Sequence, residues 1–141
     1  NNENITVYNA VFDDDKISGM ISQRGSDPVI LTNANDATVR RRFTISHELG
    51  HFYLHSDSKN SDFTDTVDDF RIPINLEEPW DEIRRMEWQA NVFAAELLMP
   101  QTLFQELAYA YRDVDSIAAL FLVSQEACRI RCEQLHIRLE E

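Results

Sequence analysis

The sequence predicts an α+β fold in which a small N-terminal antiparallel sheet packs on a helical core. Two observations predict it: residues 1–35 are mainly β-prone stretches separated by turn formers, and long helical patterns fill most of the remainder. The chain has 141 residues, 43% of them hydrophobic, with only three Gly and four Pro. This length and composition suit a single domain over residues 1–141 that buries its core without disulfide bonds.

The β-prone stretches are Ile5–Tyr8, Ile17–Ser22 and Val29–Thr32. The intervening segments Asp13–Asp15 and Gly25–Pro28 are rich in residues that form turns. Three short strands joined by two turns are therefore expected to form the sheet.

Two long helices are expected in the middle of the chain. The first covers residues 36–55, with Asp36 as its N-cap and no Pro to interrupt it. The second covers residues 80–99 and ends at Pro100. Between them, residues 56–79 are rich in Asp, Ser and Asn, which predicts a loop with, at most, a short hairpin.

Shorter helices are expected over residues 101–135. Asp115 and Ser124 are the candidate N-caps of the last two. Cys128 and Cys132 lie four residues apart, and therefore on one face of the last helix. Reduced thiols in a core are the expected reading, since few further Cys or His stand at metal-ligand spacing nearby.

The formal charge of −12 opposes binding to nucleic acids and to anionic membranes. Leu120–Ala127 resembles a helix-turn-helix, but Arg129, Arg131 and Arg138 are outnumbered there by four Glu, so direct nucleic acid binding is not expected. The segment instead suits a structural cap or a protein-docking surface. No apolar run approaches the roughly 20 residues that span a bilayer, and the N-terminus lacks signal-peptide character, so we expect a cytoplasmic protein with no membrane partner.

The segment from His47 to His51 reads His-Glu-Leu-Gly-His and carries the chemistry. Two His four residues apart on a helix are separated by about 6 Å along the axis and share a face, so they can bind one zinc ion. Such an ion lowers the pKa of a bound water toward about 7, and Glu48 is placed to accept its proton. Gly50 in a helix interior indicates close packing or a substrate path. The alternative is a surface helix that carries these residues without function.

A catalytic zinc needs a third protein ligand. His55 lies about 12 Å of helix rise from His47, too far to share the ion, so a structural role is expected. Glu87 is the better candidate, because Asn91 shares its helix face and could support a ligand histidine from behind. The residues alone leave open the alternative that Glu87 faces solvent.

Two segments together, Arg42–His51 and Glu87–Pro100, resemble the ImmA/IrrE family of metallopeptidases. The resemblance extends from about residue 20 to residue 135. It implies a zincin-like, gluzincin-like fold. It also implies limited proteolysis of a DNA-binding repressor of the phage or stress-response type. The alternative is a non-catalytic, metal-binding anti-repressor that sequesters such a partner.

The same resemblance implies roles for single residues. His47, His51 and Glu87 become the metal ligands, Glu48 the catalytic base, and Asn91 the residue that supports a ligand histidine. The ion is expected to be Zn²⁺, and two His with one carboxylate also accept Mn²⁺.

Two features of substrate binding follow only as expectations. An extended peptide would add to a sheet edge, for which Val29–Asn33 is the candidate. A second electrophile would stabilise the oxyanion, and by residue type it could be Tyr53, Tyr109, Tyr111 or His136.

Overall fold

The computed structural model describes residues 4–22, 27–55, 63–66, 70 and 81–139. Its elements confirm the predicted α+β class, with four strands in the first half of the chain and helices through the rest. The chain divides into two compact units, residues 1–94 and residues 95–141. That residues 1–141 act as one domain stays a prediction.

The sheet of the first unit is mixed. Its strands are β1 (Thr6–Ala10), β2 (Ile17–Ser22), β3 (Val29–Asn33) and β4 (Phe63–Thr66), in the order β1-β3-β2-β4. Strand β2 pairs antiparallel with β3, as expected, and also with β4, whereas β1 pairs parallel with β3. The expectation of an antiparallel sheet was therefore wrong for β1. Since β3 lies between β1 and β2, which run in opposite directions, it can be antiparallel to only one of them.

Strand β4 occupies part of the segment that was expected to be a loop. Phe63 pairs with Ile21 of β2, and Asp65 pairs with Gly19. The polar composition of this stretch hides its strand character, because only one face of an edge strand needs to be apolar. The rest of the expected loop, apart from Phe70, lies outside the described residues.

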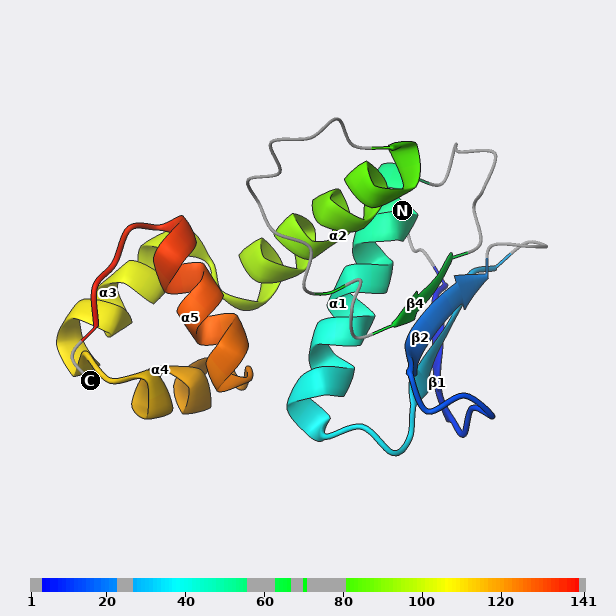
Figure 1. Ribbon diagram of the computed structural model, residues 1–141, viewed down its shortest axis with the longest axis horizontal. Helices are drawn as coiled ribbons and strands as arrows, with labels where there is room; N and C mark the ends of the chain where they lie inside the picture. Colours follow the sequence, from blue (N-terminus) through cyan, green and yellow to red (C-terminus); the bar gives the residue numbers. More distant parts are fainter. Residues whose placement is uncertain (1–3, 23–26, 56–62, 67–69, 71–80, 140–141) are drawn as a thin grey trace. The chain divides into compact units, whose positions relative to one another are not determined.

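Helix α1 (Thr38–His55) packs on β2 and β3, and helix α2 (Glu82–Leu98) packs on α1 (Figure 1). Two glycines permit these close approaches. A Cβ atom on Gly19 would collide with Thr44 of α1, and one on Gly50 would lie 3.0 Å from Cα of Ala90 in α2. The close packing expected at Gly50 is therefore confirmed. Between the sheet and the helices lies a small core of Ile21, Ile30, Phe63 and Met86.

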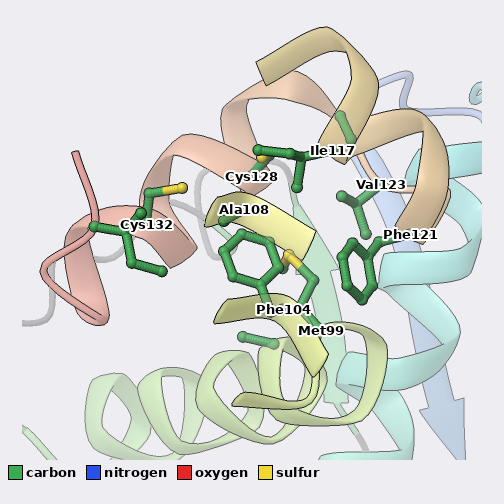
Figure 2. Close-up of a cluster of buried hydrophobic side chains, with 11 residues drawn as sticks. Met99, Phe104, Ala108, Ile117, Phe121, Val123, Cys128 and Cys132 are labelled. Atoms are coloured by element: carbon green, nitrogen blue, oxygen red, sulfur yellow. The ribbon is translucent and has the colours of Figure 1, made fainter. Parts of the chain in front are cut away.

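The second unit contains helices α3 (Gln101–Tyr111), α4 (Val114–Phe121) and α5 (Gln125–Gln134). Figure 2 shows the apolar cluster at its centre, where the Phe104 and Phe121 rings lie 5.2 Å apart. Cys128 and Cys132 are free and buried, as predicted. The buried members of the cluster are Ala95, Met99, Phe104, Ala108, Ile117, Ala118, Phe121, Val123, Cys128, Cys132 and Ile137.

Of the two N-caps predicted for this unit, one is confirmed and one is wrong. Ser124 caps α5 by accepting a hydrogen bond from the backbone N–H of Ala127 at 3.0 Å, as predicted. Asp113 caps α4 by accepting from the N–H of Ser116 at 2.9 Å, so the expectation of Asp115 was wrong. Aspartate stands at both position 113 and position 115, and α4 begins at Val114, directly after Asp113. Within the described ranges, no helix combines the length and apolarity that a bilayer crossing requires.

Candidate metal centre

Two imidazoles on α1 converge on one point. His47 and His51 are fully buried, and their Nε2 atoms lie 3.1 Å apart. A tetrahedral zinc ion with Zn–N bonds of about 2.0–2.1 Å separates two nitrogen ligands by about 3.3 Å. The spacing of the two nitrogens is therefore close to that of two ligands on one ion.

Helix α2 brings Glu87 to the same point. Its Oε1 lies 2.8 Å from Nε2 of His51, and its Oε2 lies 3.0 Å from Nε2 of His47. Glu87 is only 4% exposed, so the alternative of a solvent-facing carboxylate was wrong. The close approach of α1 and α2 at Gly50 allows a side chain as short as glutamate to reach both imidazoles.

Residues behind the imidazoles fix their orientation. Nδ1 of His47 lies 2.7 Å from Oδ1 of Asn91, an oxygen that can only accept, so Nδ1 donates. A neutral His47 then presents the lone pair of Nε2 to the shared point. Asn91 thus lies behind His47, on the side of the imidazole away from the shared point.

His51 is oriented through a longer chain of hydrogen bonds. Nε2 of His55 lies 2.8 Å from Oε1 of Gln89 and donates to it, and Nδ1 of His55 lies 2.9 Å from Nδ1 of His51. Burial lowers the pKa of His55, which favours its neutral form. His55 Nδ1 then accepts from His51 Nδ1, and the lone pair of His51 Nε2 faces the shared point. His55 thus links His51 to Gln89, and no sequence pattern pointed to Gln89.

Strand β4 contributes a group that the sequence reasoning missed. Asp65 is 1% exposed, and its Oδ2 lies 3.4 Å from Nε2 of His47 and 3.6 Å from Nε2 of His51. Two residues earlier on the same face of the strand, the Phe63 ring stacks on the His51 ring with centroids 3.8 Å apart. The alternation of these two residues was the available signal, and the surrounding polar composition obscured it.

Glu48 completes the cluster. It is fully buried, and its Oε1 lies 4.0 Å from Nε2 of His51, farther away than the oxygens of Glu87. One donor atom from each of His47, Glu48, His51 and Asp65 lies within 4.8 Å of the others. Glu48 is thus beside the point where the imidazoles converge, rather than between them.

The electrostatics of the cluster suit a divalent cation. Burial alone would lower the pKa of His47, but Asp65 and Glu87 outweigh it and raise that pKa to about 9. Burial raises the pKa of Glu87 against the opposing effect of the imidazoles. The pKa of Asp65 is lowered, because Glu48 and the imidazoles outweigh burial. Three buried carboxylates around two imidazoles need positive charge, and a metal ion can supply it in place of the proton on His47.

The remaining candidates are the expected sheet edge and the four residues considered for the oxyanion. Val29–Asn33 forms β3, which pairs on both sides, so the expectation that it offers a sheet edge was wrong. Tyr53 lies on α1 with its ring 5.8 Å from that of Phe93. Tyr109, Tyr111 and His136 belong to the second unit.

One cation of the candidate helix-turn-helix is already engaged. Arg131 is 3% exposed, pairs with Glu96 at 2.9 Å and donates to the backbone oxygen of Met99 at 3.1 Å. The Arg131 guanidinium is therefore engaged by groups of the second unit.

Comparison with known proteins fits this geometry. The model of the peptidase M78 family, described as an IrrE N-terminal-like domain, matches residues 2–133. The chain is also similar to uncharacterized immunity region protein 2 of Bacillus phage phi105, with 27% identity over 116 residues. That alignment spans 82% of this chain and 66% of the phage protein, just under two thirds of the latter. A family match over nearly the whole chain, together with a buried cluster of histidines and carboxylates, shows that the chain belongs to the peptidase M78 family.

Proposed function

We propose that this chain is a zinc-dependent endopeptidase that cuts a regulatory protein, a DNA-binding repressor, at a limited number of bonds. One observation carries the proposal. Glu87 of α2 reaches the Nε2 atoms of both histidines of α1, with Glu48 beside them. A set of two imidazoles, one carboxylate and an adjacent second carboxylate is the donor set of a metal-dependent peptidase.

His47, His51 and Glu87 would hold the ion, and Asn91 and His55 would keep the imidazoles in the required tautomers. When bound, zinc polarises the scissile carbonyl and makes a water acidic enough to be deprotonated near neutral pH. Manganese suits the same donors.

Glu48 would serve as the general base. Its burial excludes bulk water from the carboxylate, and its position on the helix beside His47 brings it next to the ligands without placing it between them. It would accept the proton of the attacking water and then deliver it to the leaving amine.

Strand β4 would receive the substrate. Among the described strands it is an edge of the sheet, since it pairs only with β2. An extended peptide can add to such an edge through backbone hydrogen bonds, and β4 runs directly past the candidate metal centre. An edge that accepts only an extended segment favours cleavage at exposed, unfolded stretches, and therefore limited proteolysis.

The proposal that the substrate is a repressor is supported by the phage relative, whose name places it in an immunity region. The resemblance of Arg42–His51 and Glu87–Pro100 to the ImmA/IrrE family implies a repressor of the phage or stress-response type. A repressor is also compatible with the charge of −12 on this chain, because DNA-binding proteins are commonly basic and would be attracted to it.

A second function is favoured by one observation. Asp65 adds a fourth protein group to the cluster, and zinc sites with four protein ligands are usually structural. A non-catalytic anti-repressor that holds its partner without cutting it would have such a site.

Cleavage separates the two functions. Repressors encoded near this gene would be incubated with the zinc-loaded chain and their masses measured. We expect new fragments from the wild type. With Glu48→Gln we expect zinc to be retained and the cutting rate to fall by at least about 100-fold, the usual contribution of a general base. A repressor that is bound but keeps its mass would support sequestration, and undiminished cutting by Glu48→Gln would contradict the role of Glu48.

A further inference from the structure

We propose that Asp65 is a fourth protein ligand of the bound ion, so that the resting site is closed and opens only when Asp65 gives way to water. This rests on the proposed metal site of His47, His51 and Glu87. It adds a function for strand β4 beyond receiving the substrate.

The position of the Asp65 carboxylate carries the inference. Its Oδ2 lies 3.4 and 3.6 Å from the two Nε2 atoms, close to the roughly 3.3 Å between ligands on a tetrahedral zinc ion. The oxygens of Glu87 lie 2.8 and 3.0 Å from the same nitrogens. The carboxylates of Asp65 and Glu87 therefore both lie beside the two imidazole nitrogens, close to the distances between ligands of one ion.

The burial of Asp65 points to a ligand rather than to a structural hydrogen bond. The residue is 1% exposed, and its polar neighbours among the described residues include Glu48 and the two imidazoles, none of which makes a hydrogen bond of ordinary geometry to its side-chain oxygens. A buried carboxylate without such donors is costly unless a cation compensates it. The carboxylate is directed to the place where a cation would do so.

The fold holds Asp65 there through its neighbours on β4. Phe63, on the same face, stacks on His51, and Asp65 pairs across the sheet with Gly19. Because Gly19 lacks a side chain, β2 approaches α1 at Thr44 closely enough for the neighbouring strand to reach the site. Thr64, between the two inward residues, is exposed.

Closure has a chemical consequence. A catalytic zinc keeps one position for water, and with Asp65 bound that position is taken. Hydrolysis would then require the Asp65 carboxylate to give up its place to water, while His47, His51 and Glu87 would keep theirs. An edge strand that pairs with an incoming peptide could shift in this way, so that substrate binding and opening of the site are coupled.

The test compares Asp65→Ala with the wild type and with Thr64→Ala, a matched control on the exposed face of the same strand. Zinc affinity would be measured by competition with a chromophoric chelator, and the visible spectrum would be recorded after cobalt is substituted for zinc. We expect Asp65→Ala to bind zinc at least about tenfold more weakly and to change the cobalt spectrum, with Thr64→Ala unaffected. Unchanged affinity together with an unchanged spectrum would overturn the proposal, because a carboxylate that only contacts Glu48 would give that result.

Two further measurements complete the experiment. Asp65→Asn keeps the size of the side chain and removes its charge, so it should weaken zinc binding in the same direction even if Asp65→Ala folds poorly. At saturating zinc, Asp65→Ala should cut a repressor at least as fast as the wild type, and slower cutting would contradict closure by Asp65. If no form of the chain cuts but Asp65→Ala still weakens zinc binding, the proposed peptidase activity fails and the ligand role of Asp65 stands.

Discussion

Substituting alanine for Gly50 would test whether the approach of α1 and α2 sets the geometry of the metal centre. A Cβ atom at this position would lie 3.0 Å from Cα of Ala90, 3.1 Å from Cβ of Phe93 and 3.2 Å from the backbone oxygen of Ala90. All three distances are below ordinary van der Waals contact, and two of the three atoms belong to the backbone. The helices must therefore separate by several tenths of an ångström.

Two effects on stability oppose each other. Alanine is favoured over glycine in a helix interior by about 1 kcal/mol. Overpacking of a close contact typically costs about 1–3 kcal/mol, so the free energy of unfolding should fall by about 1 kcal/mol. The effect on metal binding is larger, because His47 and His51 flank Gly50 on one helix, and Glu87 and Asn91 flank Ala90 on the other. Ligand distances tolerate only about 0.2 Å, so zinc affinity should fall by about tenfold or more.

The assay is urea unfolding of the metal-free protein together with zinc competition, using Leu54→Ala as a control. Leu54 is on the same helix and is 53% exposed, so its truncation alters α1 without touching α2. A Gly50→Ala protein that is stabilised by about 1 kcal/mol, as helix propensity alone predicts, and that binds zinc normally would refute the reasoning.

Four other outcomes are expected. Glu87→Gln should weaken zinc binding by more than about 100-fold, which is a larger loss than the substitution of a residue that only supports a ligand causes. Near-normal zinc content after dialysis would contradict this. Asn91→Ala should weaken it by about 10–100-fold in the same competition assay, while Asn91→Asp, which restores an acceptor for His47, should recover most of the loss. Gln89→Leu should weaken zinc binding by about tenfold because His55 loses its acceptor, and Gln89→Glu should not; equal effects would rule out the hydrogen-bond chain. The pKa of His47 is raised to about 9 in the metal-free protein, so the contribution of this residue to stability is complete below about pH 6.5 and is lost as the pH rises through 9. Urea unfolding with a chelator present should therefore show a free energy of unfolding that decreases over this window. An increase would contradict the prediction.

Local patterns in the sequence predicted the parts of the fold that depend on local chemistry. The helix of the histidine motif begins at Thr38, two residues after the expected start, and ends at His55 as expected. The one-turn spacing of His47 and His51, and of Glu87 and Asn91, determined which side chains share a face. Glycine in the middle of a helix indicated close packing or a substrate path at Gly50, and the structure shows close packing against Ala90 and Phe93.

Non-local pairing could not be predicted in the same way. The parallel pairing of β1 with β3 depends on the order of strands in the sheet, which no single segment specifies. Asp65 reaches the site because β4 pairs with β2 beside Gly19, a contact across more than 40 residues of sequence. The link from Gln89 through His55 to His51 joins two helices in the same manner.

The central claim is that α1 and α2 together hold one catalytic ion. A crystal structure of the zinc-loaded chain, with anomalous data collected at the zinc absorption edge, tests it most directly. We expect a single strong anomalous peak bonded to Nε2 of His47, Nε2 of His51 and a carboxylate oxygen of Glu87, and in the resting site also to Asp65, with Glu48 beside the ion and not bound to it. A peak located elsewhere, or one bonded to Glu48 in place of Glu87, would contradict it.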